Sequence, residues 1–551
     1  MPTGGLAQNM DEEAFEAFLE AHTRLIAPLS RQSALAYFEA TQTGKKEAYE
    51  RYSDLSLAER MIYADPEAFR RIEAFKDSGK VQDPALARQL ELLYNAFLAN
   101  QIPLELLERI TRKETSVEET FNTFPYEIDG KPVSNNEITR ILKEETDSGR
   151  LEKAYEAQKA VGKAVAPELL ELINLRNEAA RGLGFSDYYT MSLKLDEQDT
   201  SWVHALFGEL KALTDSPYKA LKETLDEALS VRYGIPKDAL MPWHYQDPFF
   251  QAAPEVFGTG TEALFKGKDV VELAKFYYAS LGIPVYDILS RSQPITPAPG
   301  KNPHAYAIDI DRSGDIRVFL NVENDAYWMD TLLHELGHAA YDRYIDPALP
   351  YTLRIPAHTF VTEAIAMFFE RLPRTAAWLR DMGLLNQVEA KRLDPGLKAA
   401  LRADELVFAR WDMVMTRFER ALYEDPDQDL DALWWRLVQD YQGLTPPKRK
   451  NQDWAAKIHF SSSPAYYHNY LLGELLASQL YAKVLDDVVG AERNTEPSLV
   501  AEPRLKGFLT ENIFRYGAEY RWDDLIVKAL GQPLSPEAFI RQFGGMPEQA
   551  P

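Results

Sequence analysis

The sequence predicts a large, mainly α-helical protein with one small antiparallel sheet near its middle. From residue 11 to about 120, apolar residues recur every three to four positions, which is the period of an amphipathic helix. The segment HAYAIDIDRSGDIRVFLNV (304–322) instead has the pattern of two paired strands that turn at Ser313-Gly314. After this pair the chain is helical again to about residue 490. No repeat or flexible linker is visible, so we expect residues 1–551 to form a single unit of interleaved helical subdomains.

Local signals predict the remaining elements. FPYEIDGKPVS (124–134) is a short hairpin signal with its turn at Asp129-Gly130. Helical patterns then cover residues 137–145 and 151–184, and glycines end the second of these helices. Residues 234–260 and 292–303 are rich in proline, glycine and aromatic residues, which is typical of ordered loops.

Composition excludes several classes of protein. The chain has no cysteine, so it has neither disulfides nor thiolate metal sites. Its net charge of −24 argues against binding to nucleic acid or to an anionic membrane, because both need a basic face. We find no apolar run long enough to predict a membrane-spanning helix. No leader is visible, so we expect a cytoplasmic protein; a periplasmic or secreted form whose leader has been removed is the alternative.

The segment TLLHELGHAAYDRY (331–344) carries the strongest chemical signal. In a helix, His334 and His338 lie on one face, so their imidazoles can converge on one metal ion. Glu335 is rotated away from that ligand position but can lie beside a water molecule on the metal. This is the arrangement of a metal-assisted hydrolase, with two zinc ligands and a general base. The alternative is a helix with two incidental histidines.

A catalytic zinc site needs a third protein ligand. The acids downstream are Asp342, Asp346, Glu363 and Glu370. We favour Glu363, 25 residues beyond His338, because a carboxylate in the apolar stretch HTFVTEAIAMFFERL is costly unless it is paired or binds a cation. Glu370 is the weaker ligand candidate. Asp342 could accept a hydrogen bond from a ligand histidine without binding the metal itself. Glu363 could instead lie on the wet face of an amphipathic helix.

The strand before the histidine helix favours a peptide substrate. A sheet edge offers N–H and C=O groups to an extended peptide, and small residues such as Ala305 and Ala307 let another backbone come close. A structural hairpin with a covered edge fits the same sequence.

A second polar cluster lies in WAAKIHFSSSPAYYHNYLLGE (454–474). Its tyrosines and histidines could donate hydrogen bonds to the oxyanion that forms during peptide hydrolysis. A lysine could bind a substrate carboxylate. Aromatic-rich loops also occur simply as packing. The residues concerned are Lys457, His459, Tyr466, Tyr467, His468 and Tyr470.

These segments resemble the angiotensin-converting enzyme family of zinc peptidyl-dipeptidases, and the resemblance covers most of the chain. The family has a histidine-alanine-x-alanine strand 30 residues before its H-E-x-x-H helix. Here His304-Ala305-Tyr306-Ala307 precedes His334 by the same interval. The family's glutamate-alanine-isoleucine ligand helix corresponds to Glu363-Ala364-Ile365.

Two further blocks extend the resemblance. The family has a lysine-x-histidine sequence followed by two tyrosines three residues apart. Lys457, His459, Tyr467 and Tyr470 match it if one residue is inserted between the pairs. IPKDALMPWHYQ (235–246) resembles a family segment that ends in a substrate-binding glutamine, here Gln246.

The resemblance implies a role for each matched residue. His334, His338 and Glu363 would hold one zinc ion. Glu335 would activate water and later pass the proton to the leaving amine. His459 and Tyr470 would stabilise the transition state. His304 and the backbone of Ala305 and Ala307 would bind the peptide. Gln246, Lys457 and Tyr467 would bind the C-terminal carboxylate.

Some positions depart from the family pattern. The aspartate that usually orients a zinc histidine is Met367 here, so that support must come from elsewhere. The arginine that binds an activating chloride is Asn469, which puts chloride activation in doubt. The 25-residue step to Glu363 fits the related thimet oligopeptidase family. Both families imply a helical body divided by a deep channel, with an N-terminal helical lid, here about residues 10–120.

We therefore predict a zinc-dependent peptidyl-dipeptidase that releases dipeptides from the free C-terminus of oligopeptides. An oligo-endopeptidase of the thimet oligopeptidase type is the first alternative. A non-catalytic helical peptide-binding protein and an H-E-x-x-H hydrolase of another substrate class are the others. The natural substrate, the oligomeric state and a metal other than zinc stay open.

Overall fold

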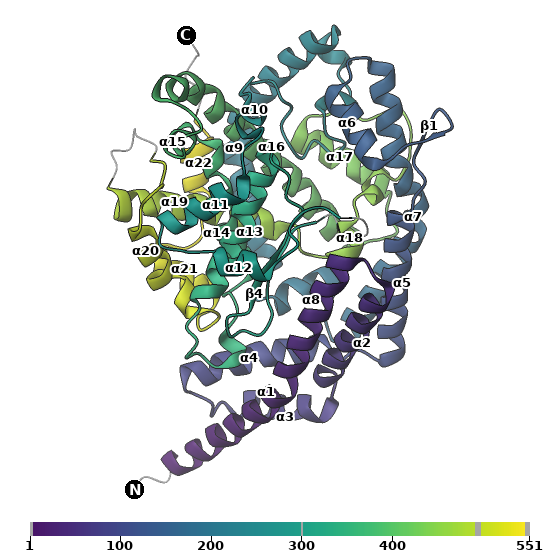
Figure 1. Cartoon of the computed structure of the whole chain (residues 1–551). Helices are drawn as coiled ribbons and strands as arrows, with labels where there is room; N and C mark the ends of the chain where they lie inside the picture. Colours follow the sequence, from purple (N-terminus) through teal and green to yellow (C-terminus); the bar gives the residue numbers. More distant parts are fainter. Residues whose placement is uncertain (1–3, 299–300, 303, 491–496, 546–551) are drawn as a thin grey trace. The chain divides into compact units, whose positions relative to one another are not determined.

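Regular structure in this protein is almost entirely helical (Figure 1). The structure, a computed structural model, describes residues 4–298, 301–302, 304–490 and 497–545. Within these ranges the strands form two short antiparallel hairpins. The prediction of a mainly α-helical fold with a small sheet near the middle is confirmed.

The chain divides into two compact units, and each unit is assembled from three separate segments. Unit 1 contains residues 1–101, 260–394 and 473–535. Unit 2 contains residues 102–259, 395–472 and 536–551. Two helices, α16 (Gln387–Glu424) and α19 (His468–Val484), include the residues at which the chain passes from unit 2 to unit 1 or back. The expected channel and lid stay predictions, and the boundary after Gln101 falls inside the range expected for the lid.

Unit 1 begins with four helices around an aromatic core. Phe15, Phe18, Ile72, Leu93 and Phe97 are buried there. Helices α3 and α4 begin after aspartates whose side chains accept N–H groups of the first turn, and each has a proline in that turn. The helices are α1 (Gly4–Thr43), α2 (Lys46–Tyr63), α3 (Pro66–Ser78) and α4 (Pro84–Ala99).

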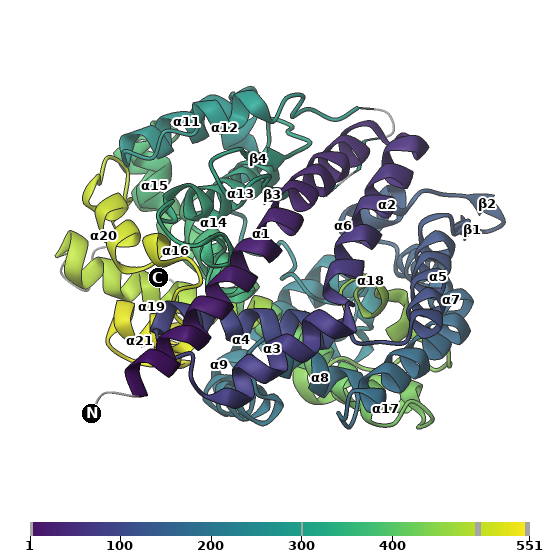
Figure 2. The same cartoon turned by 90° about the horizontal axis from the view of Figure 1, so that it is seen from below.

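The second segment of unit 1 carries the sheet and the histidine helix. Strand β3 (Tyr306–Asp309) pairs with β4 (Ile316–Phe319), with Ala307 opposite Val318. Both strands lie beside α13 (Figure 2). The helices of this segment are α10 (Thr261–Phe265), α11 (Val270–Ser280), α12 (Tyr286–Arg291), α13 (Ala326–Tyr344), α14 (Thr359–Glu370) and α15 (Ala376–Asp381). The third segment adds α20 (Arg504–Asn512) and α21 (Trp522–Leu530).

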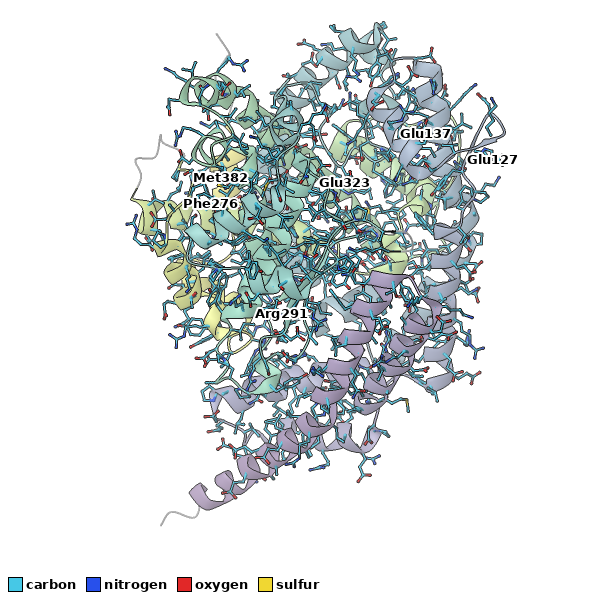
Figure 3. All side chains as sticks on the ribbon, viewed as in Figure 1. Glu127, Glu137, Phe276, Arg291, Glu323 and Met382 are labelled. Atoms are coloured by element: carbon cyan, nitrogen blue, oxygen red, sulfur yellow. The ribbon has the colours of Figure 1, made fainter. Side chains whose placement is uncertain are left out.

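Unit 2 is built on two long helices, α7 (Ser148–Gly182) and α9 (Thr200–Tyr233). Each begins after an aspartate that caps the first turn, and α9 ends at Gly234, whose φ of 63° few other residues adopt without strain. The surface hairpin β1 (Glu127–Ile128) and β2 (Lys131–Pro132) lies where the sequence predicts it, and Glu127 is exposed there (Figure 3). The other helices are α5 (Leu104–Asn122), α6 (Asn135–Glu144), α8 (Tyr188–Leu195), α17 (Leu430–Gln442), α18 (His459–Ser462) and α22 (Glu537–Phe543).

One of the two loops that the composition predicts, 234–260, contains short helical turns. Within 234–260 these are 3-10 helices at Lys237–Ala239 and Pro242–Tyr245. A third such turn, Asp453–Ala456, precedes α18. Across the described parts of the chain, no helix has the length and apolar composition needed to cross a bilayer.

Candidate metal centre and peptide-binding groups

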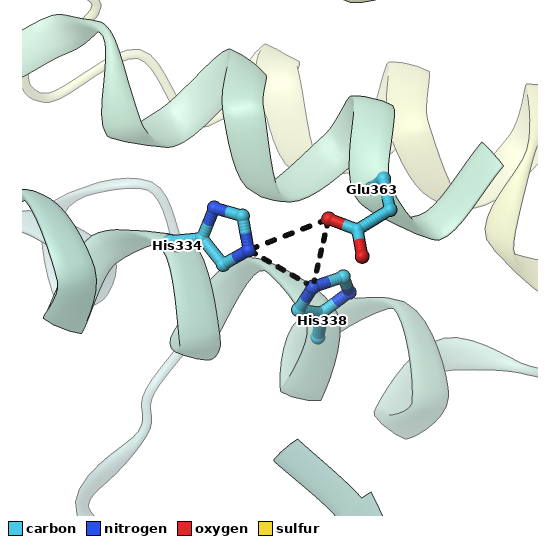
Figure 4. Close-up of side chains that lie close together, drawn as sticks. All are labelled: His334, His338 and Glu363. Carbon is cyan, nitrogen blue, oxygen red and sulfur yellow. Dashed lines mark hydrogen bonds and ion pairs between the residues drawn. The ribbon is translucent and has the colours of Figure 1, made fainter. Parts of the chain in front are cut away.

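His334, His338 and Glu363 bring three metal-ligating atoms together in unit 1. The Nε2 atoms of the two histidines on α13 are 3.2 Å apart. Glu363 of α14 places Oε2 3.5 Å from His334 Nε2 and 3.7 Å from His338 Nε2 (Figure 4). We call these three residues the metal group. The sequence predicts the same three ligands.

The spacing of these atoms fits a tetrahedral zinc site. Zinc lies about 2.0–2.1 Å from its nitrogen and oxygen ligands, so two ligand atoms of a regular tetrahedron are about 3.3 Å apart. The three separations in the metal group are close to this value. Two imidazoles and one carboxylate are also the ligand set of one type of catalytic zinc site. The donor atoms and their geometry therefore fit a zinc ion.

Two glycines let the helices approach closely enough for these side chains to meet. A Cβ atom at Gly337, between the two histidines, would lie 2.9 Å from the Ala366 Cα of α14. A Cβ atom at Gly473 of α19 would lie 3.1 Å from the Glu363 Cβ. A Cβ contact of 2.9 Å is shorter than real Cβ atoms make, and one of 3.1 Å would force the neighbouring atoms to shift. Glycine at both positions thus sets the distance from α14 to its neighbours.

Two side chains orient the histidines from outside. His334 Nδ1 is 2.7 Å from Glu370 Oε2, and His338 Nδ1 is 2.7 Å from Thr362 Oγ1. Such partners fix the ring so that the other nitrogen faces the metal. Glu370 therefore orients His334, a role that Met367, at the position of the family's usual aspartate, cannot fill. The sequence suggests Glu370 only as a metal ligand. Its position two helical turns after Glu363 places it on the same face of α14, and this spacing is the signal that it could contact a histidine.

The surroundings of the metal group carry excess negative charge. Burial, together with Glu363 and Glu370, raises the pKa of Glu335 to about 7, and the nearby His334 and a hydrogen bond from the Ala307 N–H oppose this rise. Burial lowers the pKa of His338 to about 4, which keeps its imidazole neutral, as a metal ligand must be. Three acids beside two imidazoles in a buried site are costly unless a cation balances them.

Strand β3 lies against the histidine helix through Ala307. The Ala307 N–H donates to the Glu335 carboxylate, so this N–H points away from β4 and toward α13. Ala305 and Ala307 are half-buried, and His304 is exposed. Asn321 donates to the His304 carbonyl at 3.2 Å and holds the entry to the strand. The peptide-binding role of these three residues stays a prediction.

The other downstream acids lie outside the metal group. Burial and the nearby Asp309 raise the pKa of Asp342 to about 8. Asp346 accepts the N–H of Ala348 at 2.9 Å, at the start of the loop after α13. Neither belongs to the three residues whose donor atoms converge.

A second cluster, in unit 2, surrounds Lys457. The Lys457 Nζ atom donates to Gln251 Oε1 at 2.8 Å and lies 5.2–5.5 Å from the ring centres of Phe249, Trp411 and Tyr467. Burial lowers the Lys457 pKa to about 8, although the nearby Asp247 favours the charged form. The Tyr467 hydroxyl accepts a hydrogen bond from Trp411 Nε1 at 2.7 Å, so its own proton remains available to a ligand. We call Lys457, Gln251 and Tyr467 the anchor group.

Gln246 lies elsewhere in the same loop. Its side chain is buried, and Oε1 accepts the N–H of Glu255 at 2.9 Å. The glutamine that contacts Lys457 is Gln251, which Asp247 holds through its N–H and its amide. The sequence prediction did not include Gln251. The only local hint is that a second glutamine follows Gln246 by five residues in the same aromatic loop. The role of Gln246 stays a prediction.

His459 and Tyr470 lie close to Tyr467. The ring of Tyr467 is 5.1 Å from that of His459 and 5.3 Å from that of Tyr470. Asn469 stands at the position of the family's chloride-binding arginine. It is buried, and its Oδ1 accepts a hydrogen bond from Gln198 Nε2 at 2.8 Å. Unit 2 thus gathers the donors expected to bind carboxylate and oxyanion, whereas unit 1 gathers the metal ligands and the base.

Comparisons with known proteins agree with this chemistry. The family model described as angiotensin-converting enzyme matches residues 9–245 and 255–544. Carboxypeptidase 1 of Bacillus subtilis is 24% identical over 416 residues, which cover 70% of this chain and 80% of that protein. Angiotensin-converting enzyme of Rattus norvegicus is 22% identical over 549 residues, which cover 94% of this chain and 40% of that protein. The chain thus spans less than half the length of the rat enzyme.

Proposed function

Because this chain belongs to the angiotensin-converting enzyme family and is therefore a metallopeptidase, we propose that it is a zinc-dependent peptidyl-dipeptidase. It would release dipeptides from the free C-terminus of oligopeptides. The observation that carries this proposal is the convergence of His334, His338 and Glu363, with Glu335 buried beside them.

Unit 1 would supply the hydrolytic chemistry. Zinc held by the metal group would acidify a water molecule and polarise the scissile carbonyl. The Glu335 carboxylate takes a proton from the attacking water and then gives it to the nitrogen of the leaving amine. This carboxylate is buried beside the metal group, where it can accept a proton from water and release it again. The edge of β3 at Ala305 and Ala307 binds the peptide backbone as an added strand.

Unit 2 would supply recognition and stabilise the developing charge. The Lys457 ammonium and the Tyr467 hydroxyl bind the terminal carboxylate, and Gln251 steadies the lysine from the other side. His459 and Tyr470 donate hydrogen bonds to the oxyanion that forms as water adds to the carbonyl. The anchor group explains why a free C-terminus matters, because neutral peptide ends do not attract a buried cation.

A specific comparison favours a second candidate. The Bacillus subtilis relative is named a carboxypeptidase, and a carboxypeptidase also requires a free C-terminus. Under this reading the chain removes C-terminal residues without a preference for dipeptides. The proposed anchor group fits both activities.

Product analysis separates these candidates. One oligopeptide is incubated with purified protein as a free acid and as a C-terminal amide, with and without a chelator, and the products are identified by mass spectrometry. We expect dipeptides from the free acid, little product from the amide, and recovery of chelated protein by zinc. Single amino acids would support the carboxypeptidase. Equal cleavage of both peptides, or cuts scattered along the chain, would support an oligo-endopeptidase and overturn the proposal.

A further inference from the structure

A buried arginine of α7 binds the backbone directly beside His459. Arg176 is 1% exposed. Its Nη1 atom donates to the Phe460 carbonyl at 2.8 Å, and its Nη2 atom donates to the Ser461 carbonyl at 2.7 Å. Both carbonyls belong to α18, the four-residue helix that begins at His459. One guanidinium group thus holds the turn from which the His459 side chain projects.

Three other elements of unit 2 fix the direction of this guanidinium. Glu114 of α5 accepts from Nη2 at 2.6 Å, and the Tyr423 hydroxyl of α16 accepts from Nη1 at 3.1 Å. The ring of Tyr188 in α8 lies 5.5 Å from the Arg176 Cζ. Glu114 compensates the buried charge of Arg176, and the hydrogen bonds to Phe460 and Ser461 join two backbone carbonyls at one place.

A buried acid holds the other end of the same segment. Glu419 of α16 is 2% exposed, and its Oε1 atom accepts the N–H of Ala465 at 2.8 Å. Ala465 has a φ of 55°, a left-handed conformation that is unfavourable for alanine. The hydrogen bond to Glu419 favours this conformation, which directs the chain toward Tyr467 and Tyr470.

We propose that Arg176 and Glu419 are positioning residues that clamp residues 460–465 and thereby fix His459 and Tyr470 in the geometry that stabilises the transition state. The inference rests on the proposed function, in which these two side chains face the oxyanion. Neither Arg176 nor Glu419 needs to touch substrate. Each acts through the backbone of the clamped segment.

The proposal predicts a loss confined to the chemical step. An oxyanion donor acts only where negative charge develops, so a displaced donor lowers kcat more than it changes KM. A misplacement of about 1 Å can cost about 100-fold in rate. We therefore expect Arg176→Met to lower kcat by about 100-fold and to change KM little.

Arg410→Met is a matched control. Arg410 is also 1% exposed, lies in unit 2 and has buried hydrogen bonds, but its partners are Asp215, Thr214 and the Lys211 carbonyl. Loss of either arginine should destabilise the fold to a similar extent. Per folded molecule, only Arg176→Met should lose kcat. Equal kcat losses in the two variants would overturn the clamp.

A double-mutant cycle tests whether Arg176 acts through His459. If it does, Arg176→Met should cost much less in a His459→Ala background than in the parent, because the group it positions is already absent. Independent losses that multiply would contradict the proposal. If His459→Ala alone leaves kcat unchanged, the proposed catalytic role of His459 fails, which is a different result from failure of the clamp.

Glu419 provides the test if Arg176→Met does not fold. Glu419→Gln keeps an acceptor for the Ala465 N–H and should retain kcat, whereas Glu419→Met removes it and should lower kcat. Binding of a dipeptide product, measured by calorimetry, should change less than kcat, because Lys457 and Gln251 of the anchor group lie outside the clamped segment. Equal kcat values in the two variants, or equal losses of kcat and dipeptide binding, would refute the clamp.

Discussion

The metal group and the anchor group differ in charge, in surroundings and in how they are assembled. The metal group combines two imidazoles with one carboxylate, and its three residues come from two helices within 30 residues of sequence, from 334 to 363; Glu335 and Glu370 lie beside it. The anchor group centres on one cation walled by aromatic rings, and its residues come from a loop near residue 250 and a segment near 460. The proposed function assigns a cation to one group and a carboxylate to the other.

This difference indicates a division of labour. Substitutions at the metal group should act on turnover or metal affinity, because these residues contact the reacting atoms or the ion that activates them. Substitutions at the anchor group should act on substrate affinity, because a terminal carboxylate is bound equally before and during the reaction. Three predictions test this division, and a fourth tests the close packing beside the metal group.

Replacement of Glu335 should have the largest effect. Glu335→Gln removes the base and keeps the size of the side chain, so kcat should fall by about 10³–10⁴-fold while zinc is retained. Steady-state kinetics and elemental analysis of the same sample measure the two quantities. Activity near that of the parent would contradict the assigned role, whereas lost zinc would show that Glu335 supports the metal group instead.

Removal of Glu370 should weaken metal binding. Glu370→Ala leaves the His334 Nδ1 without the carboxylate at 2.7 Å, and loss of such a partner raises the Kd for metal by about 10–100-fold. Competition with a coloured chelator measures this constant. Glu272→Ala, which removes an exposed acid of α11 paired with Lys275, is the control and should leave the Kd unchanged.

The anchor group should make substrate affinity depend on pH. Burial lowers the pKa of Lys457 to about 8, so its positive charge is present below that pH and is lost as the pH rises through it. KM for a free-acid peptide should therefore rise above about pH 8, by about tenfold per pH unit once the lysine is mostly neutral, while kcat changes less. Lys457→Arg should remove this dependence, because guanidinium stays charged. A flat KM in the parent protein would exclude Lys457 as the anchor.

The smallest effect should be on stability. A Cβ atom at Gly337 would press on α14, so Gly337→Ala should cost about 1–3 kcal/mol of folding free energy. Gly507→Ala on α20 is the matched helical control, because nothing lies within 4 Å of the added atom. That change should stabilise the protein by up to about 1 kcal/mol. Chemical denaturation followed by circular dichroism compares the two.

Much of the fold follows from local patterns. The periodicity of apolar residues predicts a helical chain, and turn residues at Asp129-Gly130 and Ser313-Gly314 predict both hairpins. The three metal ligands could be identified because two are one helical turn apart and the third is an acid in an apolar helix. Such signals are readable because the contacts are short in sequence.

The arrangement of distant segments could not be read in this way. Gln251 contacts Lys457 across 206 residues, and Arg176 reaches Phe460 across 284. Gln246 and Gln251 look alike in the sequence, and only the path of the loop decides which of them meets the lysine. The same holds for Glu370. Helical spacing places it on the same face of α14 as Glu363, but only the packing of α14 against α13 brings it to His334 Nδ1, the ring nitrogen that faces away from the metal group.

The sequence by itself therefore determined the helical class, both hairpins and the three residues that form the candidate metal group, because each depends on the period of a helix, on one turn or on an acid in an apolar helix. Tertiary structure decided which side chains contact the two histidines, which glutamine lies beside Lys457 and which buried side chains bind the segment after His459. These contacts depend on how closely helices pack and where loops cross, and that information is spread over the whole chain.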